Sequence, residues 1–314
     1  MTTKLRVGLI GAGGISVPHI EALLALGSEV RMLRRTDAPV LAEVYGIEIV
    51  DDLDALLDAV DVVDIISPTR THPDIALRAI ARGRHVICEK PLAATSEDAA
   101  QIVRAAADAG VRLFPAHVVR YFPEYWRIKQ AADAGEIGDV TSLTLSRVGA
   151  GPAGAWFFDE NVGGGLIRDL MIHDIDQALW LAGPVASVSA VQTPPSAAGV
   201  APREVTAVVT LTHRGGAVSR IHGGWLGPGT PFRTAIDVTG TTGRLQHDSA
   251  DAAVDGYLPP ATGGQSPYLL QLADFLSALE AGADARILPA EAVDAVAVVD
   301  AAYASLAARA PVTL

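Results

Sequence analysis

The amino-acid sequence predicts an α/β protein of two domains: a doubly wound parallel sheet over residues 1–120, followed by an α+β domain over residues 121–314 with an open, mainly antiparallel sheet. The chain has 314 residues, which exceeds the size that a single hydrophobic core usually supports. Up to about residue 120, short β-branched runs alternate with longer amphipathic segments. Beyond that point the strands are longer and tight turns join them, which indicates a second kind of domain.

The first domain is predicted from strands that lack polar alternation and are separated by helices, a pattern typical of a parallel sheet covered on both faces. Its strands are expected at residues 5–10, 29–34, 47–50, 62–67, 85–89 and 111–116. Its helices are expected at residues 21–27, 39–46, 52–59, 74–83 and 96–110. Several of these helices end at a glycine, which suits a C-cap.

The second domain is predicted from long strands joined by tight turns, so neighbouring strands are expected to be antiparallel. These strands are expected at residues 139–148, 203–213, 217–225 and 232–240, and the turns include residues 214–216 and 241–243. Helices are expected at residues 124–134, 165–181, 268–280 and 291–308. Two segments rich in Gly, Pro and Ala, residues 149–154 and 192–202, are expected to be loops.

Composition and charge exclude several partners. A net charge of −12 and a pI near 5.0 disfavour binding to a nucleic acid or to an anionic membrane, because both would repel the protein. The longest apolar runs, such as residues 62–66, are far shorter than a membrane span. The sequence enters its first strand without the apolar region of a secretion signal, and a single cysteine excludes an internal disulfide. We therefore expect a cytoplasmic protein without a membrane partner.

A glycine-rich loop follows the first predicted strand and precedes a helix. Gly11 permits the tight turn, and Gly13 lets the backbone approach a pyrophosphate at the helix N-terminus, where free amides and the helix dipole favour an anion. Ser16 departs from the third position of G-x-G-x-x-G but is small enough for close packing. A plain glycine-rich turn is the alternative, yet its place in a six-strand pattern favours a Rossmann domain that binds a dinucleotide. The expected cofactor contacts near these strand ends are Gly11, Gly13, Gly14, Ile15 and Ser67.

The residues after the second strand select the dinucleotide. An NAD site normally has a carboxylate here for the ribose hydroxyls, whereas arginine pairs with a 2′-phosphate. Arg35 falls about where the acid is expected, next to Arg34, so the sequence favours NADP(H) over NAD(H). The alternative is that both arginines are solvated and that Asp37 is the ribose acid.

Lys90 leaves the carboxyl end of the fifth predicted strand, on the sheet edge where the nicotinamide is expected. A lysine in a buried position costs several kcal/mol unless it is paired, and Glu89 beside it offers a partner. A surface ion pair is the alternative. The position favours a role at the cofactor for both residues.

Asp169 and His173 lie four residues apart on a predicted helix, so one helical face presents both. A carboxylate beside a histidine fixes its tautomer and raises its proton affinity, which suits proton exchange with an alcohol or a carbonyl. Two alternatives stay open. The histidine could be structural, or the pair could bind a metal, although no third ligand is evident and we expect none.

These motifs together resemble the glucose-fructose oxidoreductase and inositol dehydrogenase family, Gfo/Idh/MocA. The shared marks are the glycine loop, E-K-P at residues 89–91 and G-G-G-x-x-x-D-x-x-x-H at residues 163–173, and the similarity continues to residues 297–306. The resemblance implies that Lys90 hydrogen-bonds the reacting hydroxyl and the nicotinamide ribose, that His173 is the general acid and base, and that Asp169 binds substrate and orients His173. Arg35 departs from the family's usual acid.

The resemblance implies an NAD(P)-dependent oxidoreductase that acts on a secondary alcohol, or the ketone, of a sugar, inositol or related polyol. Three alternatives stay open: a biosynthetic keto-sugar reductase, a cofactor-recycling glycosidase and a redox sensor that binds NADP(H) without chemistry. Arg120, Tyr121 and Trp156 are candidates for substrate contact or for ordinary packing. An open sheet needs a cover, so we expect a homodimer or a homotetramer.

Overall fold

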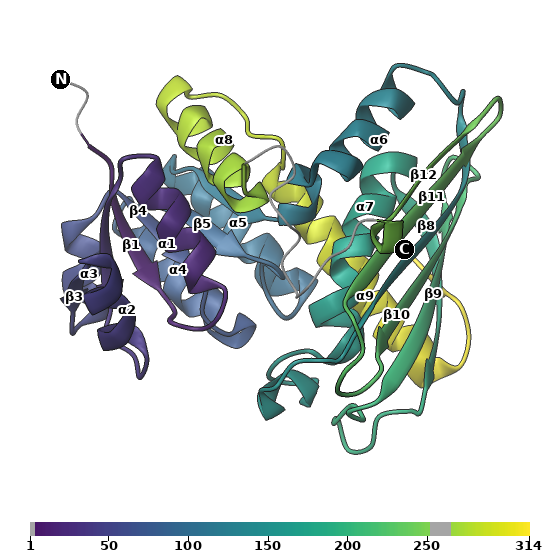
Figure 1. The fold of residues 1–314 in the computed structure, drawn as a ribbon, viewed down its shortest axis with the longest axis horizontal. Helices are drawn as coiled ribbons and strands as arrows, with labels where there is room; N and C mark the ends of the chain where they lie inside the picture. The colour runs from purple at the N-terminus through teal and green to yellow at the C-terminus, as the bar shows by residue number, and fades with distance from the viewer. Residues whose placement is uncertain (1–3, 252–264) are drawn as a thin grey trace. The chain divides into compact units, whose positions relative to one another are not determined.

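The computed structural model describes residues 4–251 and 265–314, and contacts divide the chain into two compact units (Figure 1). The first unit consists of residues 1–121 and 263–293, and the second of residues 122–262 and 294–314. The boundary near residue 121 agrees with the change of rhythm in the sequence. The first unit also takes in a segment from the last fifth of the chain.

The first unit contains a six-stranded parallel sheet in the order β3-β2-β1-β4-β5-β6. Its strands are β1 Arg6–Ile10, β2 Glu29–Leu33, β3 Glu48–Val50, β4 Val62–Ile65, β5 His85–Glu89 and β6 Leu113–Ala116. The helices between them are α1 Ser16–Ala25, α2 Ala38–Tyr45, α3 Leu53–Ala59, α4 His72–Ala81 and α5 Ser96–Ala109. The strand order reverses between β1 and β4. This reversal is the switch point at which doubly wound sheets bind ligands.

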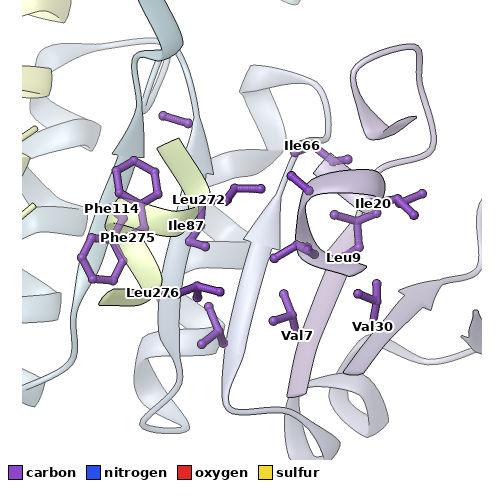
Figure 2. Close-up of a cluster of buried hydrophobic side chains, with 14 of the residues drawn as sticks. Val7, Leu9, Ile20, Val30, Ile66, Ile87, Phe114, Leu272, Phe275 and Leu276 are labelled. Carbon is purple, nitrogen blue, oxygen red and sulfur yellow. The ribbon is translucent and has the colours of Figure 1, made fainter. Parts of the chain in front are cut away.

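An apolar cluster joins the sheet to helix α8, Pro267–Ala281 (Figure 2). Phe275 of α8 stacks on Phe114 of β6 with ring centroids 5.2 Å apart, and Leu272 is fully buried in the same cluster. The sequence assigned this helix to the second domain, whereas the structure packs it into the first unit. Helical periodicity identifies the apolar face of α8 but does not say which core that face covers.

The second unit contains a seven-stranded sheet in the order β12-β11-β7-β10-β9-β8-β13. Its strands are β7 Val140–Gly149, β8 Val185–Thr193, β9 Val205–His213, β10 Val218–Trp225, β11 Arg233–Gly240, β12 Arg244–Asp248 and β13 Val312–Thr313. The sheet is mainly antiparallel, as expected, but β7 and β10 pair in parallel. Three strands, β8, β12 and β13, were not expected, and β8 enters the segment expected to be a loop at residue 192.

The helix expected at residues 165–181 contains a π-helical turn, η4 Ile167–Met171, which leads directly into α7 Ile172–Ala182. Gly223 of β10 lies against this turn, and a Cβ atom there would come within 2.5 Å of the Met171 sulfur. A larger residue at this position would therefore force the Met171 side chain to move from the sheet. The other helices of this unit are α6 Pro123–Asp133 and most of α9 Pro289–Ala308. Among the described residues, no helix is both long and apolar enough to cross a membrane.

Candidate functional site

The glycine loop at the end of β1 has the geometry of a phosphate-binding turn. Gly11 has φ +135°, and a Cβ atom there would lie 2.5 Å from the carbonyl oxygen of Ile66, so only glycine fits. A Cβ atom at Gly13 or Gly14 would meet no described atom within 4 Å, which leaves the backbone open to approach. The buried Ser16 hydroxyl donates to the Gly13 carbonyl at 2.5 Å. Ser16, the first residue of α1, thus links the start of the helix to the loop.

The switch point of the sheet adds a second element to this loop. Ile15 precedes α1 and provides no side-chain cap. The first backbone amides of the helix can therefore donate hydrogen bonds to an anion. Ser67 follows β4, which neighbours β1, and its hydroxyl lies 2.6 Å from the Thr71 hydroxyl. These residues fit the pyrophosphate of a nicotinamide dinucleotide.

The two arginines after β2 differ in their surroundings. Arg34 forms an ion pair with Asp51, and its amide donates to the Val50 carbonyl at 2.8 Å. Arg35 is exposed, and its guanidinium donates to the Arg34 carbonyl at 3.0 Å. Asp37 is exposed and forms no side-chain cap at the start of α2. Arg35 could therefore bind a phosphate without breaking an ion pair with a carboxylate, whereas Arg34 would first have to leave Asp51.

Lys90 follows β5 and is half-buried. Its amide donates to Oε2 of Glu89 at 3.1 Å. The Pro91 carbonyl, on the other side, lies 2.9 Å from Nδ1 of the buried His72, whose Nε2 lies 2.8 Å from the Ser67 carbonyl. Burial lowers the pKa of His72 despite the opposing effect of these carbonyls. The chain on both sides of Lys90 is thus fixed by hydrogen bonds, and β1 and β5 end at the same sheet edge.

A buried histidine lies between two carboxylates beneath this edge. His19 of α1 places Nδ1 2.8 Å from Asp64 of β4 and Nε2 3.3 Å from Glu89. Burial alone would lower the pKa of His19, but the attraction of Asp64 and Glu89, together with the hydrogen bond between Nδ1 and Asp64, outweighs it and raises the pKa to about 10. The sequence analysis missed this cluster. A local signal was available, because Asp64 is a charge inside an otherwise apolar strand.

In the second unit, Asp169 lies within the π-helical turn and His173 in the first turn of α7. The expected α-helical spacing is therefore corrected, because a π turn closes from residue i to residue i+5 and is wider than an α turn. His173 is 8% exposed and Asp169 is half-buried. Turns of this kind occur frequently at functional sites.

His173 is followed by a buried ion pair. Asp174, fully buried, accepts two hydrogen bonds from the guanidinium of Arg147 on β7, at 2.9 and 3.0 Å. Burial raises the pKa of Asp174, and Arg147 opposes that shift. Asp174 thereby anchors α7 to the sheet. Arg147 was missed, although it occupies an inward position of an alternating strand.

Three candidates for substrate contact have different environments. Arg120 is 1% exposed and pairs with Glu291 at 3.0 Å. Tyr121 is equally buried and donates to Asp274 at 2.6 Å, and burial together with this bond raises its pKa. Both have packing partners within the first unit. Trp156 of the second unit is 38% exposed and stacks on Phe157, so its ring retains accessible surface.

The proposed chemical residues are thus divided between the units. Lys90 and the glycine loop belong to the first unit, and Asp169, His173 and Trp156 to the second. Within the described ranges, no group of three or more His, Cys, Asp or Glu side chains has a geometry that could hold a metal ion.

Comparison with known proteins decides the family. The profile of an oxidoreductase family with an NAD-binding Rossmann fold matches residues 5–117, and that of the GFO/IDH/MocA C-terminal domain matches residues 125–246. The chain belongs to the Gfo/Idh/MocA oxidoreductase family. It is therefore an NAD(P)-dependent oxidoreductase with a Rossmann domain, as the sequence resemblance implied.

Full-length relatives agree with this assignment. The chain is 27% identical to inositol 2-dehydrogenase of Rhizobium meliloti (strain 1021), with 99% of each chain covered. It is 30% identical to D-xylose 1-dehydrogenase (NADP(+)) 2 of Haloferax volcanii, with 99% of this chain and 100% of that protein covered. The crystal structure of GenD2 from gentamicin A biosynthesis in complex with NAD matches with a TM-score of 0.89 at 28% identity, and covers 100% of this chain and 97% of that one.

Proposed function

We propose that this protein is an NADP-preferring dehydrogenase or reductase that acts on a secondary alcohol, or the corresponding ketone, of a sugar, inositol or related polyol. The observation that carries the proposal is the full set Lys90, Asp169 and His173 in a chain that matches polyol and sugar dehydrogenases over their whole length. A redox sensor has no need of a chain that carries a general acid and base as well as a lysine of this kind. We therefore do not favour that alternative.

The proposed mechanism assigns one proton path and one electrostatic contact. When bound, the nicotinamide supplies the acceptor or donor of the hydride. His173 takes the hydroxyl proton of the alcohol, or returns it to the carbonyl in the reverse direction. Lys90 donates a hydrogen bond to the same oxygen, where negative charge develops in the transition state. Asp169 binds a neighbouring hydroxyl and orients the imidazole.

Further contacts are proposed for cofactor and substrate. The amides of Gly13, Gly14 and Ile15 face the pyrophosphate, and Arg35 pairs with the 2′-phosphate. The exposed ring of Trp156 packs on an apolar face of the sugar. Arg120 and Tyr121 act through packing, since both are buried and paired within the first unit.

We also propose that the second unit binds a further copy of the chain through its sheet. The positions that alternate away from α7 on β7 and β9, such as Thr144, Val208 and Thr210, are exposed or half-buried and lie on β-branched strands. Association through this face predicts a dimer or tetramer. Light scattering of the purified protein tests this, and a monomer at micromolar concentration would refute it.

The enzymatic proposal is tested by nicotinamide absorbance with NADP⁺ or NAD⁺ and separate pools of sugars, inositols and sugar acids. Reduction of the cofactor in one pool, faster with NADP⁺ than with NAD⁺, is the expected outcome. If every pool is silent although NADPH binds, the same pools are oxidised chemically to ketones and assayed with NADPH. Silence in both directions would overturn the proposal.

A further inference from the structure

The contacts around Lys90 form a chain that begins at the glycine-loop helix. Nδ1 of His19 lies 2.8 Å from Asp64, and Nε2 of the same ring lies 3.3 Å from Oε1 of Glu89. The other oxygen of that carboxylate, Oε2, accepts the Lys90 amide at 3.1 Å. One carboxylate therefore makes an ion-pair contact with the imidazole and accepts the backbone amide of the proposed catalytic lysine.

Burial makes this chain of contacts rigid. The side chains of His19 and Asp64 are fully buried, and that of Glu89 is 10% exposed. Burying two carboxylates away from water costs several kcal/mol for each ion unless a cation lies between them. The imidazolium supplies that cation, and its pKa of about 10 keeps it protonated at neutral pH. Asp64 holds Nδ1 by a hydrogen bond, and Nε2 then lies 3.3 Å from Oε1 of Glu89, an ion-pair contact rather than a hydrogen bond.

Helix α1 connects this cluster with the cofactor loop. Ser16 fastens the first residue of α1 to Gly13, and His19 follows three residues later on the same helix. The loop and Glu89 are thus connected through α1 and the side chain of His19. His72 provides a separate anchor on the other side of Lys90, at the Pro91 carbonyl.

We infer that His19 is a positioning residue for the reaction: by holding the Glu89 carboxylate, it fixes the Lys90 backbone relative to the glycine loop. The inference rests on the proposed function of Lys90, but its structural part does not require turnover. The contact between Nε2 and Glu89 holds the carboxylate, whereas the bond between Nδ1 and Asp64 orients the imidazole ring.

Two substitutions separate the sides of the ring. His19→Asn keeps a donor near the Nδ1 position, toward Asp64, and loses the one toward Glu89. His19→Gln keeps a donor near the Nε2 position, toward Glu89. His85→Gln is the matched control, because His85 lies at the opposite end of β5 and its Nδ1 accepts the Arg112 amide.

The primary measurement is hydrogen exchange of the Lys90 amide in the NADPH-bound protein, which reports the hydrogen bond to Glu89 without any substrate. Exchange is expected to be about tenfold faster in His19→Asn, and within about threefold of wild type in His19→Gln and His85→Gln. Unchanged exchange in a folded His19→Asn protein would overturn the inference. If His19→Asn does not fold, the test falls to His19→Gln. Exchange of the Lys90 amide about tenfold faster than in wild type in that variant would also overturn the inference.

The second measurement is kinetic and uses the substrate found in the pool assay. kcat is expected to fall about tenfold in His19→Asn with the NADPH dissociation constant and KM unchanged, and less in His19→Gln. A fall in NADPH affinity with unchanged kcat would contradict positioning of Lys90. If no pool gives turnover, the proposed function fails, and the exchange data still decide whether His19 holds Glu89 and Lys90.

Discussion

Each unit buries an ion pair beside a residue of the proposed chemistry, and the two pairs differ in kind. Next to Lys90 the cation is His19, which lies between Asp64 and Glu89. Next to His173 the cation is Arg147, which holds Asp174 through two parallel hydrogen bonds. An arginine stays charged at every accessible pH, whereas an imidazolium can lose its proton.

Two ion pairs that are buried to a similar degree can thus differ in their response to pH. The pair with arginine is a permanent anchor, and the pair with histidine is a titratable one. The Arg147–Asp174 pair fixes α7 to β7 with the planar geometry that arginine and carboxylate share. The His19 cluster fixes the exit of β5 only while the ring is protonated. We therefore expect pH to act on the two units differently.

The largest effect is expected at His173, which directly precedes Asp174 of the permanent anchor. His173→Ala removes the proposed acid and base, and turnover should fall by about 10²- to 10⁴-fold while NADPH still binds. His247→Ala, a half-buried histidine on β12 of the same unit, is the matched control and should keep wild-type turnover. Turnover undiminished in His173→Ala would remove this residue from the mechanism.

The Arg147–Asp174 anchor is tested by breaking it from one side. Arg147→Met leaves Asp174 buried without its cation, and the free energy of unfolding should fall by about 3–5 kcal/mol in urea denaturation. The double variant Arg147→Met/Asp174→Leu removes both charges and should recover most of that loss. A single variant that loses no more than about 0.5 kcal/mol, the cost of a surface change, would show that the pair is not an anchor.

The titratable cluster predicts a pH dependence with a definite sign. The folded pKa of His19 is raised from 6.5 to about 10, so its stabilisation is complete below pH 6.5 and is lost as the pH rises toward 10. Relative to His19→Gln, wild type should lose stability from pH 7 to 10, on the order of a few kcal/mol. Cys88, whose pKa burial also raises, titrates in both proteins and cancels in the difference. Parallel stability curves would contradict the charge assigned to His19.

Cofactor preference compares two arginines of the first unit: Arg35, whose guanidinium donates to a backbone carbonyl, and Arg34, which is paired with Asp51. Arg35→Asp should lower the ratio of NADPH affinity to NADH affinity by at least about tenfold. A carboxylate repels the 2′-phosphate of NADPH and accepts hydrogen bonds from the ribose hydroxyls of NADH. Arg34→Ala should leave the ratio almost unchanged, since Arg34 is paired with Asp51. An unchanged ratio in Arg35→Asp, measured by fluorescence titration, would shift the assignment to Asp37.

The smallest effect is expected where polar residues serve packing. Tyr121→Phe removes the hydrogen bond to Asp274, which still accepts the Arg286 amide at 2.8 Å. The free energy of unfolding should fall by about 1 kcal/mol, and KM should not change. A raised KM with unchanged stability would restore Tyr121 as a substrate contact.

The sequence predicted the parts of the fold that depend on local pattern. Most strands of the parallel sheet are short, largely apolar runs, and the helices between them have clear periodicity, so most bounds agree with the structure to within a few residues, whereas α1 begins at Ser16, five residues before its predicted start. The strands β12 and β13 escaped prediction because one is polar and at the edge, and the other has two residues. The unit to which α8 belongs depends on contacts far apart in sequence, as does the parallel pairing of β7 with β10.

The same distinction applies to the candidate site. Gly11, Lys90, Asp169 and His173 follow motifs of fixed spacing, which a single sequence displays. The π turn beneath Asp169 and the contacts of His19 arise from packing between distant elements, so spacing alone predicted the wrong turn and missed the cluster. The one local sign of the buried His19 cluster was the charge of Asp64 within an otherwise apolar strand.

The most direct test of the central claim follows the hydrogen atom itself. The substrate pool that responds is prepared with deuterium on its carbinol carbons and incubated with wild-type protein and NADP⁺, and the reduced cofactor is analysed by mass spectrometry. We predict that deuterium appears in NADPH, because the enzyme oxidises a secondary alcohol by direct transfer. Reduced cofactor without deuterium, or product released with no change in the nicotinamide, would contradict the account.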